Sequence, residues 1–500
     1  MARLLRALAA VSIAAHEIRL DLEQGPAYLT FQADDDLETV ADAFAARHDL
    51  KGGEGCTGRE CVVRMLTSAM RLEMGDGSIG VNRVSVSGVE YRRQGAREVR
   101  RQGLEHAPPP QTAAPAARLV QAPCAPPFCA FECATSDAAV EERLARDFIQ
   151  DNPELRELMT TYPPRRTCPR GALYPIFIGI PRSEVVQCVP RKHYGFRGGH
   201  RSKFGDRAYA FDFRDEAEYK RAYREAYFGA TKKKAGWDCM RHYEIVASGA
   251  VPFFDDDPTQ APEGTLAFWP RKLLRDLRTW PGVHSANSTV DADLLDASGY
   301  GALAAGLLTY LRDRLTTAAL ATYILETMGQ ADARKVLILS AHPAPDFLRE
   351  SVVHGFREIL GVDAVDFIKP QHLYEPSAEA PWDHAQRKDL YGNGFTYAYR
   401  LRDDPRVDRS DVVAKIRAHF FDVVVYASVH RGLPYFDAVR GHYGPGEIAF
   451  VDGEDEHGWS NFSAALPEMG HYFMRELPDG CPPEVEVEGG FFASSGYLVL

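Results

Sequence analysis

Three lysines stand together in a chain whose net charge is −12: Lys232, Lys233 and Lys234. They follow a short apolar segment (228–231) and precede Gly236, after which a helical pattern runs over residues 238–248. Backbone N–H groups at a helix N-terminus have no partner within the helix, and the helix dipole adds partial positive charge there. The spacing therefore predicts a site for a phosphate or a diphosphate.

The elements that must position these lysines form one strand–loop–helix–strand unit. Asp238 is the predicted N-cap of the helix, and Gly249 is expected to end it in the left-handed conformation. The apolar run 250–254 then resumes as a strand. The alternative is a basic surface loop ahead of an ordinary helix, with Glu244 merely solvated.

The pattern KKAGWDCxRHYEI…G…P resembles the donor-binding half of glycosyltransferases with the GT-B fold, and it is similar to CgeB-like and exostosin-like enzymes. The resemblance covers about 27 of 500 residues. It implies that Glu244 binds the ribose hydroxyls of a nucleotide sugar and that the loop ahead of the helix, with its three lysines, Gly236 and Trp237, binds the diphosphate. The matching turn residues are Gly249 and Pro252. No further cofactor is implied.

A second basic segment lies upstream, at residues 191–203. It is rich in glycine and in cationic side chains, among them Arg197 and His200. Such a loop between strands suits an anionic ligand, and we expect it to face the same diphosphate as the lysines. A basic surface loop without a ligand is the alternative.

Three aspartates, Asp255, Asp256 and Asp257, follow the strand at 250–254. Metal-dependent transferases of the GT-A type place a divalent cation at such a position, where it bridges carboxylates to the diphosphate. This is the second hypothesis. The first predicts no metal, because lysines can neutralise the leaving diphosphate, and three aspartates before a proline also form solvated turns.

Strands and helices alternate again from Lys335 onward, which predicts a parallel, doubly wound sheet. Ligands of such sheets gather at the carboxyl ends of the strands. Those ends carry His342, Asp346, His430, Arg431, Asp452, Glu454, Asp455 and His457. Activating an acceptor hydroxyl needs a histidine or a carboxylate, and the candidates for that catalytic role are His430, Asp452 and Glu454.

This second region resembles the acceptor-side half of the same glycosyltransferases, in the segments DLYGNGFTYAYRL, FDVVVYASVHRG, FVDGEDEHG and YFMREL. In those enzymes the acceptor half comes first, whereas here it follows the donor half. Either the halves are permuted or the chain combines pieces of two enzymes. A third hypothesis is a non-catalytic binding protein that retains a GT-B-like fold.

The expected fold is α/β, with two Rossmann-like doubly wound halves preceded by a small α+β module and a linker. The expected segments are a signal or first helix (1–16), the module (17–106), a Pro/Ala-rich linker (107–138), the donor half (139–330) and the acceptor half (331–500). Apolar content of 45% is ordinary for a globular chain.

Net charge and hydropathy limit the kinds of partner that we expect this chain to bind. The negative charge argues against general nucleic-acid binding, and no apolar run reaches the ~18–20 residues of a membrane span. The expected partners are a nucleotide sugar and an acceptor. Arg3 and Arg6 before a short apolar run indicate either a secretory signal, hence a Golgi or other lumenal location, or a plain first helix in a cytoplasmic protein. Nine cysteines cannot all pair within one chain, and disulfides are expected only if the chain is lumenal.

Overall fold

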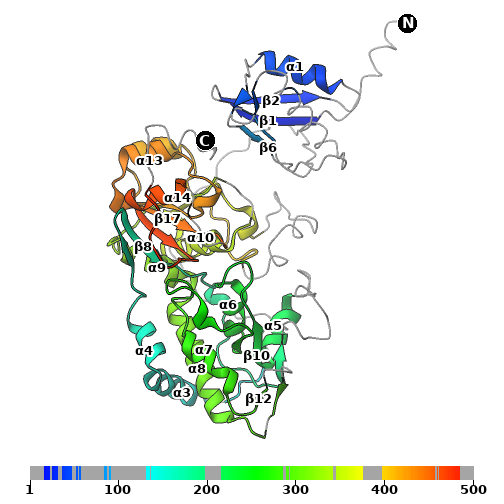
Figure 1. Cartoon of the computed structure of the whole chain (residues 1–500), viewed down its shortest axis with the longest axis vertical. Helices are drawn as coiled ribbons and strands as arrows, with labels where there is room; N and C mark the ends of the chain where they lie inside the picture. The colour runs from blue at the N-terminus through cyan, green and yellow to red at the C-terminus, as the bar shows by residue number, and fades with distance from the viewer. Residues whose placement is uncertain are drawn as a thin grey trace, which may run out of the picture. The chain divides into compact units, whose positions relative to one another are not determined.

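The structure is a computed structural model that describes residues 16–22, 25–31, 36–47, 52–53, 56–57, 63, 84–86, 89–91, 131–135, 137–197, 216–284, 289–291, 293–341, 345–375, 397–455, 459 and 461–484. The chain forms two compact units, with the boundary between residues 122 and 123 (Figure 1). Each unit has its own β-sheets.

The first unit contains short antiparallel hairpins and a helix. β1 (His16–Leu22) pairs with β2 (Gly25–Phe31), and α1 (Leu37–Arg47) follows. The segment AYLTFQ at 27–32 predicts a strand and the apolar spacing over 37–50 predicts a helix, and both predictions are confirmed over the described residues 27–31 and 37–47. The alternation of residues 84–89 predicts one strand, whereas the structure has two antiparallel strands, one on each side of positions 87–88. The remaining pairs are β3 (Gly52–Gly53) with β4 (Cys56–Thr57) and β5 (Val84–Val86) with β6 (Val89–Tyr91).

The second unit is organised around a seven-stranded sheet with the order β15–β14–β16–β17–β18–β8–β7. Its strands run parallel, except that β7 is antiparallel to β8. Every residue of β14 and β16 is buried, as expected of parallel strands covered on both faces. The mixed α/β fold with a mostly parallel sheet is confirmed. The strands are β14 (Val336–Leu339), β15 (Ala364–Phe367), β16 (Val423–Tyr426), β17 (Ile448–Asp452), β18 (His471–Met474), β8 (Gly171–Pro175) and β7 (Arg166–Cys168).

The chain reverses its direction of travel across this sheet between β14 and β16. From β14 it crosses to β15 on one side and then returns to β16 on the other side. Where two connections leave adjacent strands in opposite directions, a crevice opens at the carboxyl ends, and ligands of open α/β sheets bind there. The connecting helices are α10 (Phe347–Leu360), α12 (Val412–Arg417), α13 (Phe436–His442) and α14 (Asn461–Ala465).

Two strands of the same sheet come from before residue 331. β8 lies beside β18, and a disulfide from Cys168 at the end of β7 to Cys481 fastens the segment after β18. The apolar run YPIFIGIP at 174–181 predicts a strand, but β8 begins earlier, at Gly171, and is shorter. It ends at Pro175, and residues 176–180 remain buried outside the named strands. The Ile178 amide donates to the carboxylate of Asp238.

The smaller sheet has three parallel strands in the order β11–β10–β9. The strand–loop–helix–strand unit predicted around the lysines is confirmed, because β10 and β11 are parallel and α6 connects them. The basic segment at 191–203, expected to be a loop, contains β9, which pairs with β10. These elements are β9 (Tyr194–Arg197), α5 (Glu216–Arg224), β10 (Ala226–Thr231), α6 (Met240–Ala247) and β11 (Val251–Phe254).

Helices pack between and beside the two sheets. Leucines at helical spacing over 300–328 predict one helix, but the structure has two, α8 (Ala297–Arg314) and α9 (Thr317–Thr327). The Thr316 hydroxyl accepts a hydrogen bond from the Ala319 amide at 3.3 Å and begins the second helix. α3 and α4 lie beside α8 (Figure 1). The remaining helices are α3 (Ala138–Asp151), α4 (Pro153–Thr160) and α7 (Arg271–Asp276).

Shorter elements complete the described second unit. Its small hairpin is β12 (Val283–His284) with β13 (Thr289–Val290). The 3-10 turns are η1 (Arg182–Glu184), η3 (Pro258–Gln260), η4 (Leu277–Thr279), η5 (Gly361–Asp363), η6 (Gln371–Leu373), η8 (Val429–Arg431), η9 (Pro445–Glu447) and η10 (Leu466–Glu468). Among the described residues, none of the helices is both long and apolar enough to cross a membrane.

The end of α6 is held by the segment that leads into β9. Gly249 has φ of +72°, as its predicted left-handed conformation requires, and its carbonyl accepts a hydrogen bond from Nζ of Lys192 at 2.6 Å. Burial lowers the pKa of Lys192 to about 7. A Cβ added at Gly249 would lie 2.3 Å from Cδ of Pro190, so glycine is required here by both conformation and space.

We predict that Gly249→Ala destabilises the second unit by about 2–4 kcal/mol, from left-handed strain together with overpacking. Thermal unfolding followed by circular dichroism measures the effect. The matched control is Gly301→Ala in α8, where an added Cβ would meet no atom within 4 Å; this variant should be neutral or gain up to about 1 kcal/mol. Equal melting temperatures for the two variants would contradict the assigned role of Gly249.

Candidate active site

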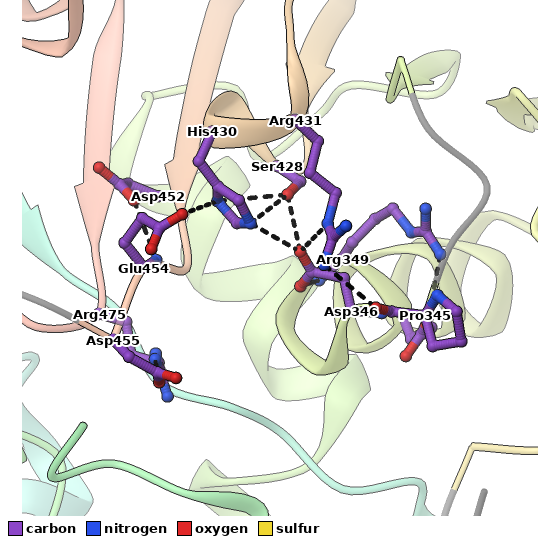
Figure 2. A network of polar contacts seen from close by, with 11 residues as sticks. Pro345, Asp346, Arg349, Ser428, His430, Arg431, Asp452, Glu454, Asp455 and Arg475 are labelled. Carbon is purple, nitrogen blue, oxygen red and sulfur yellow. Dashed lines mark hydrogen bonds and ion pairs between the residues drawn. The ribbon is translucent and has the colours of Figure 1, made fainter. Parts of the chain in front are cut away.

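Polar side chains gather at the carboxyl ends of four neighbouring strands (Figure 2). Asp346 lies after β14, Ser428 and His430 after β16, Glu454 after β17 and Arg475 after β18. The first two of these strands flank the point where the chain reverses across the sheet. The sequence-predicted residues His430 and Glu454 are therefore brought together with side chains that were not among the predicted catalytic residues.

The central contact joins His430 and Asp346. His430 lies on η8, and its Nε2 is 3.1 Å from Oδ2 of Asp346. The same carboxylate oxygen accepts hydrogen bonds from the Ser428 hydroxyl at 2.8 Å and from Nε of Arg431 at 2.9 Å. Ser428 and Asp346 are buried, whereas 20% of the His430 side chain is exposed. A small part of the imidazole therefore remains accessible.

The ionisation of this pair is set by opposing effects. Burial by itself raises the pKa of Asp346, but the hydrogen bond and charge of His430, with the charges of Arg349 and Arg431, outweigh burial and hold that pKa well below its usual range. Burial lowers the pKa of His430, but Asp346, followed by Glu454, outweighs it, so that the pKa is raised above that of an ordinary histidine. Below the raised pKa of His430, the pair is an aspartate facing an imidazolium.

Asp346 is fixed by the first turn of α10. Its Oδ1 accepts a hydrogen bond from the Arg349 amide at 3.2 Å, which makes it the N-cap. Its own amide donates to Oε1 of Glu350 at 2.7 Å, and this buried oxygen also contacts Nη2 of Arg349 at 2.9 Å and Nε2 of His372 at 2.6 Å. In the sequence, Asp346 is recognisable as a strand-end residue because it lies between an apolar run and the start of a helical pattern.

Asp452 and Glu454 have different roles in the turn after β17. Asp452 is buried, and its carboxylate accepts hydrogen bonds from the Tyr472 hydroxyl at 2.6 Å and from the Glu454 amide at 3.1 Å. Glu454 is exposed by 51%, and its Oε1 lies 3.8 Å from Nδ1 of His430. Asp452 therefore shapes the turn, while Glu454 is the carboxylate that approaches the histidine (Figure 2).

The lysine loop connects β10 to α6, and several of its backbone amides already have partners. The Lys233 amide donates to Oδ2 of Asp256 at 3.0 Å, and the Lys234 amide donates to the Gly236 carbonyl at 3.0 Å. Nζ of Lys233 lies 5.9 Å from the centre of the Trp237 ring. The positive charge that this loop can offer an anion therefore comes chiefly from its ammonium groups.

Asp238 is not the N-cap of α6 as predicted. Cys239 occupies the cap position, and helix α6 begins at Met240. The Asp238 carboxylate is buried and accepts hydrogen bonds from the Ile178 amide at 3.2 Å and from the Tyr243 hydroxyl at 3.0 Å. The carboxylate of Asp238 binds the amide of Ile178, far earlier in the chain, and does not cap α6, because a buried carboxylate needs several donors. Burial raises the pKa of Asp238.

Arg475 and Glu476, which follow β18, reach across to this loop. Nη1 of Arg475 donates to the Asp238 carbonyl at 2.5 Å, and Oε1 of Glu476 accepts from the Asp238 amide at 2.9 Å. Arg475 also pairs with Asp455, the neighbour of Glu454. Burial raises the pKa of Glu476 to about 7, against the lowering effects of Arg475 and of two backbone amides. These residues were not predicted, because the segment YFMREL indicated no strand.

Other predicted donor-site residues lie around α6. Glu244 is half-buried, and its Oε2 accepts a hydrogen bond from the Tyr219 hydroxyl at 2.5 Å. Trp237 is buried, and its carbonyl lies 2.8 Å from Nε2 of His242. The backbone of Arg197 forms the last position of β9 opposite Gly229. The predicted site residue His200 is outside the described residues, as are the strand-end candidates His342 and His457 and the first 15 residues. The predicted linker at 107–138 is described only at 131–135 and 137–138.

Two of the three aspartates after β11 accept hydrogen bonds from different partners. Asp256 accepts from the Lys233 amide, and Asp257 is the N-cap of η3, with hydrogen bonds from the amide and hydroxyl of Thr259. Asp255 is exposed. Within the part of the chain that the structure describes, no three His, Cys, Asp or Glu side chains are grouped as metal ligands.

Comparisons of the chain with protein-family models, with curated proteins and with solved structures found no match. A functional assignment therefore depends on the chemistry of the two groups of residues just described. One is the His430–Asp346 pair with Glu454, and the other is the lysine loop with Glu244. The contacts of Asp455 and Arg475 connect them.

We predict that Asp346→Asn lowers the pKa of His430 and costs roughly 3 kcal/mol of stability near pH 6, because it removes the anion from a buried ion pair. Asparagine is an equally good N-cap, so the helix start is retained. The pair stabilises the fold fully between the ordinary pKa values of aspartate (~3.9) and histidine (~6.5). That stability is lost as pH rises through the raised pKa of His430, or falls through the depressed pKa of Asp346.

Urea denaturation and NMR titration of ¹³C-labelled histidine rings measure the two effects. His430→Gln identifies the resonance of His430. The control is Asp296→Asn, at the N-cap of α8, where Asp296 accepts from the amides of Ser298 and Gly299; it should change stability by less than about 0.5 kcal/mol. An unchanged His430 pKa in Asp346→Asn would show that the two side chains are not paired in solution.

Proposed function

We propose that this chain is a glycosyltransferase that moves a sugar from a nucleotide-diphosphate donor to an acceptor hydroxyl, in a GT-B-like arrangement of two Rossmann-like halves. The observation that supports it best is a series of polar contacts, joined through neighbouring residues, between the predicted donor and acceptor sides. His430 approaches Glu454, the next residue Asp455 pairs with Arg475, and Arg475 donates to Asp238, two residues before α6 begins.

The donor side supplies positive charge for the diphosphate and a carboxylate that accepts hydrogen bonds from hydroxyl groups. The ammonium groups of Lys232, Lys233 and Lys234 neutralise the leaving diphosphate, which is the main requirement for cleaving a sugar–phosphate bond. Glu244, oriented by the hydroxyl of Tyr219, accepts hydrogen bonds from the ribose hydroxyls. The charge of the lysines makes a bound metal unnecessary for this step.

On the acceptor side, His430 is the proposed base. A neutral imidazole takes the proton of the acceptor hydroxyl while the acceptor oxygen bonds to the anomeric carbon and the nucleoside diphosphate leaves. Because Nε2 faces Asp346, Nδ1 is the nitrogen that receives the proton, with Glu454 beside it. Since the pKa of His430 is raised, the transfer rate should increase as pH rises through that pKa.

The disulfides favour an oxidising compartment. Cys133 is bonded to Cys188 and Cys168 to Cys481, while Cys239 is a free thiol. Disulfides persist in secreted and lumenal proteins and are rare in the cytosol. Of the two locations left open by the N-terminal sequence, the lumen of the secretory pathway is therefore the one we propose.

We predict that a nucleoside diphosphate, tested as UDP and as GDP, raises the melting temperature of the protein, and that Glu244→Ala abolishes the rise. At a concentration 100 times Kd, binding contributes about 2.7 kcal/mol, which corresponds to a shift of several degrees. Differential scanning fluorimetry measures the shift. The matched control is Glu263→Ala, an exposed glutamate in the same half.

Three outcomes separate the hypotheses. A shift that survives Glu244→Ala unchanged removes the ribose assignment. Absence of any shift with both nucleotides contradicts the donor site as a whole. Nucleotide binding without hydrolysis or transfer of any nucleotide sugar, over a panel of donors, favours the non-catalytic binding protein.

The metal-dependent hypothesis is tested by chelation. We predict that EDTA changes sugar-nucleotide hydrolysis or transfer by no more than about twofold, because the lysines replace the Lewis acid. Asp256→Asn and Asp257→Asn should likewise retain activity. A loss of activity in EDTA that Mn²⁺ or Mg²⁺ restores would instead support a cation held by Asp255, Asp256 and Asp257.

A further inference from the structure

Two consecutive residues after β18 hold one backbone position of the lysine loop from both sides. Nη1 of Arg475 donates to the carbonyl of Asp238, and Oε1 of Glu476 accepts from the amide of the same residue. The amide of Trp237 also stabilises the Glu476 carboxylate. The loop is thus attached through its main chain, while the Asp238 side chain is bonded elsewhere, to Ile178 and Tyr243.

The contact is buried and closely packed. Glu476 is fully buried, and Arg475 is nearly so. A Cβ added at Gly236 would lie 2.7 Å from Oε1 of Glu476 and 3.1 Å from Oδ1 of Asp455. The loop therefore needs glycine at position 236 so that these carboxylates can approach it. Glycine is therefore needed at position 236 because of contacts with residues at the end of the neighbouring sheet.

The contact also determines which groups of the loop remain for a ligand. A carboxylate takes the amide of Asp238, and another, Asp256, takes the amide of Lys233. Both carboxylates stand where main-chain amides would otherwise bind an external anion. Asp256 is exposed, so a ligand anion can replace its carboxylate at the Lys233 amide. Glu476 is buried, and its carboxylate cannot leave the Asp238 amide without opening the contact between the loop and β18.

We infer that Glu476 is a positioning residue: by accepting the Asp238 amide it fixes the lysine loop against the end of β18, so that the lysine side chains present their charge to a diphosphate. This rests on the proposed function for the identity of the ligand. The positioning itself rests only on the contacts of Glu476, Gly236 and Asp238. The role depends on an acceptor oxygen, so that glutamine, which keeps one, preserves it, and alanine removes it.

The test compares Glu476→Ala, Glu476→Gln and the control Glu263→Gln at pH 8, above the pKa of Glu476. Hydrogen–deuterium exchange of peptides covering residues 232–239 reports on the loop without any ligand. Loss of a hydrogen bond worth about 1.4 kcal/mol corresponds to about tenfold faster exchange. We expect that change at Trp237 and Asp238 in the alanine variant, and less than about threefold in the glutamine variant and the control.

Binding of UDP, measured by calorimetry on the full chain, follows the same order: about tenfold weaker in Glu476→Ala and within about threefold of the original protein in Glu476→Gln. If UDP binding were weakened equally in both variants, the charge of Glu476 would matter and its hydrogen bond would not. Unchanged hydrogen–deuterium exchange in Glu476→Ala would contradict the inference altogether. If exchange follows the expected order but the unaltered protein binds no nucleotide, the positioning role stands and the proposed function fails.

Gly236→Ala provides a second route if the alanine variant of Glu476 does not fold. Its added methyl group displaces Oε1 without removing the carboxylate. It should speed exchange at Trp237 and Asp238 in the same direction, whereas Gly301→Ala in α8 should not. Normal protection of both amides in Gly236→Ala would contradict the inference.

Discussion

The attachment of the Asp238 backbone to the end of β18 is the interaction on which the second unit depends. Residue 238 has its amide on Glu476, its carbonyl on Arg475, and its side chain on Ile178 and Tyr243. One residue thus connects the seven-stranded sheet, the segment that leaves β8, and α6. Each of these groups is buried, so that losing any one partner leaves an unsatisfied polar group that costs about 1–3 kcal/mol.

This attachment explains why charges of both signs lie close together in a chain with a net negative charge. The carboxyl ends of β17 and β18 carry acidic residues, and the loop that meets them carries three lysines. Arg475 lies between the two groups and pairs with Asp455. Without this arginine, the carboxylates of Asp455, Glu476 and Asp238 would repel one another at the place where the two sheets meet.

Local patterns were sufficient to predict β10, α6 and β11, because the strands have their own apolar runs and a glycine ends the helix. Gly249 adopts the positive φ expected after a helix. The same reasoning placed His430 and Glu454 at strand ends, where parallel pairing then brought them together. These are the cases in which neighbouring residues in sequence determine the local structure.

The prediction failed at Asp238 and at β18, where partners distant in sequence decide the outcome. Asp238 has the residue type and position of an N-cap. In the structure its carboxylate is buried and bonded to Ile178 and Tyr243, and its carbonyl accepts from Arg475. β18 is only four residues long and pairs with a strand some 300 residues earlier in the chain. No local pattern of YFMREL contains that information, so Arg475 and Glu476 were missed with it.

The geometry of the proposed acceptor side depends on how one carboxylate oxygen is shared. Oδ2 of Asp346 receives His430, Ser428 and Arg431 together. Arg431 is permanently charged, and it donates both to this oxygen and to the carbonyl of Pro345, the residue before Asp346. The orientation of the carboxylate therefore does not depend on His430 alone. The imidazole meets an acceptor oxygen that Ser428 and Arg431 already hold in place.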